Sequence, residues 1–135
     1  MHDPQRESRR WLAAAREDLA FARHAVDGGF FAPACFHAQQ AAEKAVKAVH
    51  YGRGSRAVIG HNVRALIARL EPPSEALDGQ IDAARELDLF YVPTRYPNGL
   101  DEGTPGEAFS TDQAERALKL AAAIIEAAEN SGQRA

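Results

Sequence analysis

The sequence predicts an all-α protein, a five-helix antiparallel (up-down) bundle. Apolar residues, mostly alanine, recur with a 3.6-residue period in five segments, and no segment has the alternating β-branched pattern of a strand. Most connections between these segments are short, which favours antiparallel neighbours. A length of 135 residues suits one domain over the whole chain, with a core at about 8–129 and a polar, frayed tail at 130–135.

The first two helices are long and rich in small residues. The first is predicted at about 8–26, where an apolar stripe ends before Gly28 and Gly29. The second is predicted at about 31–51 and ends at Gly52. Its inner face consists largely of alanine, which lets neighbouring helices approach closely.

The second half of the chain predicts three further helices and one long loop. A short helix at about 62–70 is ended by two prolines, and another runs from residue 74 or 78 to 91. Ser110 and Gln113 form a capping-box pattern, so the last helix is predicted at 110–129. The connection 92–109 is rich in proline and glycine, and a loop of this length in a small domain is often functional.

Composition limits the classes of function. The net charge of −3 and the pI near 5.9 argue against a protein that coats nucleic acid generally. The single cysteine, Cys35, indicates a reducing cytoplasm, and neither a signal peptide nor a membrane span is predicted. Arg6, Arg9, Arg10 and Arg16 most simply form a solvated helix face, with phosphate binding as the alternative.

The most informative run lies at residues 87–97. Pro93 disfavours helical geometry at the residue before it, so the fourth helix is predicted to end near Tyr91. Arg95 and Tyr96 then lie on a stiff, non-helical segment that ends at Pro97. This arrangement is typical of exposed recognition groups.

A second run of polar residues lies on the predicted second helix. Glu43 and Lys47 are spaced as a surface ion pair, worth about 0.3 kcal/mol, which is the simpler interpretation. The alternative is that Gln40, Lys44 and Lys47 line a groove and meet a phosphate or a partner's carboxylate. The five histidines lack the spacing of a zinc site, and the chain has neither of the glycine-rich phosphate-binding motifs, so no metal or cofactor is predicted.

The two runs together resemble the HEPN family of small helical domains. The resemblance extends over roughly residues 11–127, and its most specific part is Gln-Ala-Ala-Glu-Lys-Ala followed at this distance by Arg-Tyr-Pro. The residues that carry it are Trp11, Ala15, Asp18, Leu19, Phe36, 40–45, Lys47, Ala48, His61, Leu66, Leu87, Asp88, Tyr91 and 94–97.

The resemblance implies a five-helix domain that commonly dimerises and is often encoded beside a minimal nucleotidyltransferase, as half of a toxin–antitoxin or other two-subunit system. Many members are metal-independent ribonucleases marked by an arginine, four to six residues and a histidine. Arg95 matches the arginine, but Leu100, Asp101 and Glu102 occupy the positions where the histidine would fall. The usual proton shuttle is therefore absent.

Three functions remain open. The first is a binding subunit for a nucleotide, RNA or a nucleotidyltransferase partner, in which Arg95 binds and does not cleave. The second is a ribonuclease whose acid–base group has moved to Tyr91, Tyr96 or His61, and the third is a purely structural dimer. For the first, a shared groove is predicted, although Arg95 could instead tie its loop to Asp88 or Glu43. The predicted binding residues are Arg95, Tyr96, Tyr91, Asp88, Lys44, Lys47, Gln40 and Glu43, and the catalytic set of a nuclease would be Arg95, Tyr96 and His61.

Overall fold

The computed structural model describes residues 2–132, and this part of the chain is a helical bundle without strands, as the sequence predicts. Within it lie seven α-helices and one short 3-10 helix. Their bounds are α1 Pro4–Asp27, α2 Phe31–Gly52, α3 Val63–Ala68, α4 Glu75–Asp78, α5 Ile81–Asp88, η1 Pro97–Gly99, α6 Pro105–Ala108 and α7 Thr111–Gly132.

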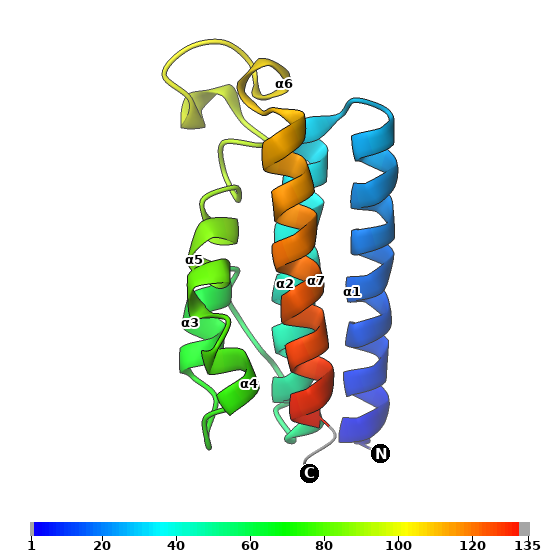
Figure 1. The fold of residues 1–135 in the computed structure, drawn as a ribbon. Coiled ribbons are helices and arrows are strands. Elements are labelled where there is room, and N and C mark those ends of the chain that lie inside the picture. Colours follow the sequence, from blue (N-terminus) through cyan, green and yellow to red (C-terminus); the bar gives the residue numbers. More distant parts are fainter. Residues whose placement is uncertain (1, 133–135) are drawn as a thin grey trace.

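Three long helices form the body of the bundle (Figure 1). Helix α2 packs against both α1 and α7, and the shorter α3, α4 and α5 pack together along one side. Helices α1 and α5 run in one direction while α2 and α7 run in the other, which is the predicted up-down arrangement. The segment between α5 and α7 lies at the end of the bundle opposite the start of α1.

Small side chains allow the close packing of the long helices. Buried alanines line the facing sides of α1, α2 and α7, and larger apolar residues such as Leu66, Leu77 and Leu87 fill the space beneath the short helices. Cys35 is fully buried among them, and burial raises the pKa of its thiol to about 12. The thiol is therefore an inert core group.

The first helix begins four residues before its predicted start. Asp3 caps it by accepting a hydrogen bond from the backbone N–H of Arg6 (3.1 Å), and Pro4 occupies the first helical position. The third helix is shorter than predicted, and the side chain of Asn62 caps it through the N–H of Ala65 (2.7 Å). The last turn of α2 is tied to α3 because His50 donates from Nε2 to the carbonyl of Leu66 (2.8 Å).

The predicted fourth helix is two helices. Helix α4 ends at Asp78, where Gly79, a poor helix former, is the C-cap. Helix α5 begins at Ile81 and ends at Asp88, before the predicted Tyr91. Residues 89–95 continue as tight turns whose backbone hydrogen bonds mostly span three residues. The prediction of one continuous helix was therefore wrong, and the five-helix count with it.

The connection 92–109 is more ordered than a plain loop. It contains η1 and α6, and α6 starts with a capping box in which Glu107 accepts from the N–H of Thr104 (3.2 Å). Phe90 and Phe109 pack edge to face across its base, 5.8 Å between ring centroids. The predicted Ser110 capping box is present, with Ser110 donating to Gln113 (2.9 Å).

Helix α7 continues to Gly132, so residues 130–132 are helical instead of frayed; residues 133–135 of the predicted tail lie outside the described residues. No helix in the described range is long and apolar enough to cross a membrane.

Candidate functional site

Arg95 lies on the turn after α5 with aromatic rings around its guanidinium. The ring centroids of Tyr91, Phe36 and Tyr96 are 4.4, 4.7 and 5.0 Å from its central carbon. Its Nε donates to the carbonyl of Tyr91 (3.0 Å), while the side chain stays exposed. The turn that Pro93 enforces thus places Arg95 over rings from its own segment and from α2.

His61 extends the same surface. Its ring stacks on Tyr91 with centroids 4.9 Å apart, and its Nδ1 donates to Glu43 (3.2 Å). The Glu43 carboxylate is buried, whereas 58% of the His61 side chain is exposed. A buried carboxylate therefore orients an imidazole whose other nitrogen, Nε2, remains available beside the Arg95 cluster.

Glu43 is also half of a buried ion pair. The Nζ atom of Lys47 lies 3.1 Å from Oε2 of Glu43 and 5.8 Å from the centroid of the Trp11 ring. Only 8% of the Lys47 side chain is exposed. The predicted ion pair is present, but the prediction of a solvated surface pair was wrong because α1 covers this face of α2.

Asp88 and Gln39 hold the start of α3 against the other helices. The Asp88 carboxylate accepts from the backbone N–H groups of Val63 (2.8 Å) and Arg64 (3.0 Å), which are the first two of α3. Gln39, fully buried on α2, donates to the carbonyl of His61 (2.7 Å). The same Gln39 nitrogen is 3.4 Å from Asp88.

A second charged cluster bridges α1 and α2 beside Phe36. Asp18 on α1 pairs with Lys44 (2.7 Å) and accepts from Nδ1 of His37 (3.3 Å). Burial alone raises the pKa of Asp18, but the hydrogen bonds and charges of His37 and Lys44 outweigh it and lower the pKa below the usual value of 3.8. The His37 ring packs edge to face against Phe36, 5.3 Å away, so this cluster adjoins the Arg95 rings.

The structure brings most of the predicted residues together, in two layers. Arg95, Tyr96, Tyr91 and His61 form the outer layer, and Glu43, Gln40, Lys47 and Asp88 lie beneath it or are tied into it. Lys44 faces α1 instead, and it reaches Arg95 only through Asp18, His37 and Phe36. Within the described residues Arg95 forms no ion pair with Asp88 or Glu43. The Glu43 carboxylate is bound by Lys47 and His61, and that of Asp88 by the N–H groups at the start of α3.

Two residues of the site were not singled out by their chemistry in the sequence. Gln39 was overlooked, although a glutamine in an alanine-rich stripe is a signal of a buried, bonded amide. Gln40 donates to its oxygen (2.8 Å), so both ends of the Gln39 amide are satisfied. Phe36 carried the family resemblance, but its position under Arg95 depends on tertiary packing.

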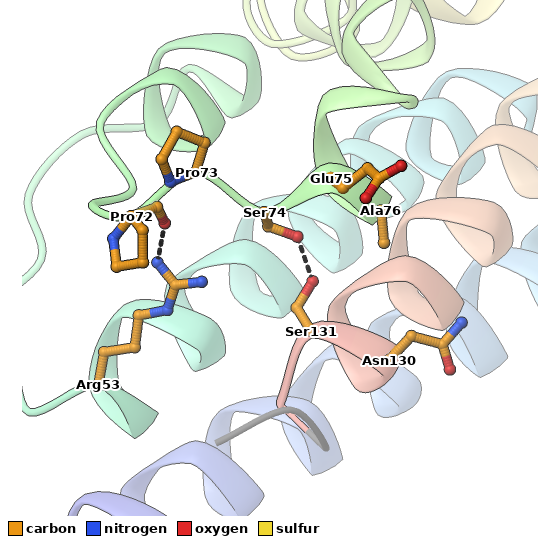
Figure 2. Close-up of a pocket in the computed structure, with 8 residues that line it drawn as sticks. All are labelled: Arg53, Pro72, Pro73, Ser74, Glu75, Ala76, Asn130 and Ser131. Carbon is orange, nitrogen blue, oxygen red and sulfur yellow. Dashed lines mark hydrogen bonds between the residues drawn. The ribbon is translucent and has the colours of Figure 1, made fainter.

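A cavity of about 1010 Å³ lies elsewhere, between the end of α2, the start of α4 and the end of α7. Figure 2 shows two hydrogen bonds among its lining residues: Arg53 donates to the backbone carbonyl of Pro72, and the hydroxyls of Ser74 and Ser131 are paired. None of the predicted site residues lines it. In the described residues no group of three or more His, Cys, Asp and Glu side chains is placed to hold a metal ion.

Comparisons with known proteins agree with the helical fold. The family model described as HEPN domain matches residues 8–131. A crystal structure from Thermus thermophilus is similar at 38% identity and a TM-score of 0.88, covering 93% of this chain and 98% of that one.

Two further crystal structures resemble the chain over 93% of its length. An archaeal HEPN homologue has 32% identity and a TM-score of 0.77 with 98% of its own chain covered. An HEPN domain protein from Thermotoga maritima has 36% identity and a TM-score of 0.72 with 99% covered. The comparison with curated proteins finds no match. On the family match and these likenesses, the chain belongs to the HEPN domain family.

Proposed function

We propose that this HEPN protein is a binding subunit, one domain that recognises a phosphate-bearing ligand, a nucleotide or an RNA, through Arg95. The observation that carries the proposal is the exposed guanidinium set among three rings, of which only Nε is hydrogen-bonded within the described part of the chain. Its remaining N–H groups form the planar fork that binds phosphate with two parallel hydrogen bonds.

The aromatic neighbours suit the rest of such a ligand. Half of the Tyr96 side chain is exposed (50%), so a base can stack on its ring while the guanidinium holds a phosphate. His61, stacked on Tyr91, widens the same platform. The acidic net charge of the chain favours recognition by this local site over binding along a general basic surface.

The proposal includes partners that the family resemblance suggests. We expect a homodimer with an isologous interface, because large apolar side chains are exposed near the site. Phe21 packs against His37, and Leu89 and Val92 lie close to Tyr91 in the sequence. A minimal nucleotidyltransferase is the proposed second protein, in a two-gene system of the toxin–antitoxin type. The buried free thiol of Cys35 is consistent with a reducing compartment, the cytoplasm.

The test is a comparison of Arg95→Lys with the wild type, because lysine keeps the charge and loses the fork. Binding of a short single-stranded RNA and of ATP is measured by fluorescence anisotropy and calorimetry. We expect affinity to fall by about tenfold or more while the melting temperature is unchanged. The matched control is Arg85→Lys, an exposed arginine on α5, which leaves binding unchanged. Unaltered binding, or a loss of melting temperature without a loss of binding, contradicts the proposal.

A ribonuclease remains the second candidate because of the His61 geometry. A buried carboxylate that orients an exposed imidazole next to an arginine is the arrangement that general acid–base catalysis requires. The test is incubation of the purified protein with RNA in the presence of a chelator. Cleavage that disappears in both His61→Gln and Arg95→Ala establishes the enzyme, and intact RNA leaves the binding subunit as the function.

A further inference from the structure

A concave site lies at the opposite end of the bundle from Arg95. It is a pocket of about 390 Å³ between the start of α1, the end of α2 and the loop that follows α2. Its size is in the range of small-molecule sites, about 300–1,000 Å³. Tyr51 lines it, fifteen residues beyond Phe36 on α2, so the two sites are separated by about 22 Å along that helix.

Arginine side chains from two separate segments face this pocket. Arg6 and Arg10 come from the first turns of α1, and Arg56 comes from the loop after α2. Among the described residues neither Arg6 nor Arg56 is part of an ion pair, so their charges are not neutralised by the protein. Three guanidinium groups around one hollow are the pattern of a site for a multiply charged anion.

The two acidic side chains in the pocket already have partners. Glu7 pairs with Nη1 of Arg10 (2.6 Å), which fixes that guanidinium and leaves its other nitrogens available. Asp3 caps α1 through the N–H of Arg6, so the helix terminus itself is not the binding group. The Glu7 carboxylate thus positions Arg10, and the Asp3 carboxylate caps the helix. Neither is free to bind a cation in the pocket.

Neutral donors complete the lining. The hydroxyl oxygen of Tyr51 accepts from the N–H of Val58 (3.3 Å), so its own hydrogen is free to donate. The Tyr51 ring is held by stacking on Trp11, with centroids 5.0 Å apart. The Nε2 atom of His2, which also lines the pocket, is buried without a hydrogen-bond partner. An unsatisfied buried nitrogen is unfavourable until a ligand or a proton partner reaches it.

We propose that this pocket binds a small anion with two or more linked phosphoryl groups. Arg6 and Arg56 bind phosphoryl oxygens from opposite sides, Arg10 is held in place by Glu7, and the Tyr51 hydroxyl donates to the same ligand. Linked phosphoryl groups fit better than a single phosphate because the arginines come from both walls of the hollow. The chemistry is shared by a free polyphosphate chain and by a nucleic-acid backbone; the compact pocket favours the free chain.

The experiment measures binding of pyrophosphate and tripolyphosphate to the full chain by calorimetry at low ionic strength. We expect saturable binding that weakens as salt is added. Arg6→Gln and Arg56→Gln each weaken it by about tenfold or more. Arg9→Gln is the matched control, since it removes the same charge from the same end of α1 but does not line the pocket, and it leaves affinity within about twofold.

Several outcomes overturn the proposal. One is the absence of saturable binding up to millimolar pyrophosphate, and another is an equal loss of affinity in Arg9→Gln, which indicates a diffuse field. A third is binding of single-stranded RNA that depends on Arg6 and Arg56 without binding of pyrophosphate, which assigns the pocket to a polynucleotide backbone. Pyrophosphate binding is assigned to this pocket only by its dependence on Arg6 and Arg56, whereas the Arg95 site is tested by the Arg95→Lys comparison, so failure at one site is distinguishable from failure at the other.

Discussion

Asp88→Ala tests whether one carboxylate holds α3 in place. The substitution removes the acceptor of the first two N–H groups of α3, at 2.8 and 3.0 Å, and leaves that of the buried Val63 without a partner. Loss of a helix cap costs about 0.5–2 kcal/mol, and a hydrogen bond to a charged group contributes about 1.5–3 kcal/mol. Water can replace the bond to the exposed Arg64 N–H, so we expect a loss of about 2–4 kcal/mol in the free energy of unfolding.

The assay is urea denaturation followed by circular dichroism, together with a thermal scan. For a domain of this size the expected loss lowers the melting temperature by roughly 10 °C. Amide exchange of Val63 and Arg64 rises more than that of the α2 amides. The control is Asp82→Ala on the same helix, whose side chain is 97% exposed, with an effect within about 0.5 kcal/mol. An Asp88→Ala variant as stable as Asp82→Ala refutes the reasoning.

Three further predictions concern stability. Burial lowers the pKa of His50 below its usual value of 6.5, so the unfolded chain binds a proton at this imidazole more tightly than the folded chain does, and the free energy of unfolding falls as the pH drops below 6.5. Denaturation measured across pH should show a smaller fall in His50→Gln. The surface variant His24→Gln should show the same fall as the wild type. Lys47→Met leaves the buried Glu43 charge without its cation and lowers the free energy of unfolding by about 3 kcal/mol in urea denaturation. The double variant Lys47→Met with Glu43→Gln regains most of that loss. Equal stability of the single and the double variant contradicts the account. Ala42→Leu overfills a fully buried position and costs about 1–3 kcal/mol by the same measurement, and a neutral result means the helices are not closely packed there.

Local sequence signals predicted the long helices well, because each signal acts within a few residues. Gly52 ends α2 and the Ser110 capping box precedes α7, as periodicity and capping rules predict. The Asp3-Pro4 pair is a helix start of the same kind and was overlooked among polar residues. The break at Gly79 was not predicted, because the apolar period continues across it; in the structure α4 and α5 pack against α7 as two separate helices.

For the candidate site, the sequence indicated which residues gather better than how they are arranged. Pro93 and its neighbours identify Arg95 as an exposed group, since proline acts on the adjacent backbone. The positions of Lys44 and Lys47 differ although both lie on α2 within one turn: one pairs with Asp18 on α1 and the other is buried with Glu43. Which face of α2 is covered by α1 is a tertiary property, and spacing along one helix does not contain it.

The rings around Arg95 limit the motion of its side chain in the absence of any ligand, which bears on the kinetics of the proposed binding. Tyr91, Phe36 and Tyr96 restrict the guanidinium before any anion arrives, and the bond to the Tyr91 carbonyl fixes its direction. A free arginine side chain loses about 1.5–2 kcal/mol of rotamer entropy when it is immobilised, and here the fold has already met most of that cost. For the proposed binding, this ordering lowers the entropy that association must remove, and we expect ligands of Arg95 to differ mainly in their dissociation rates.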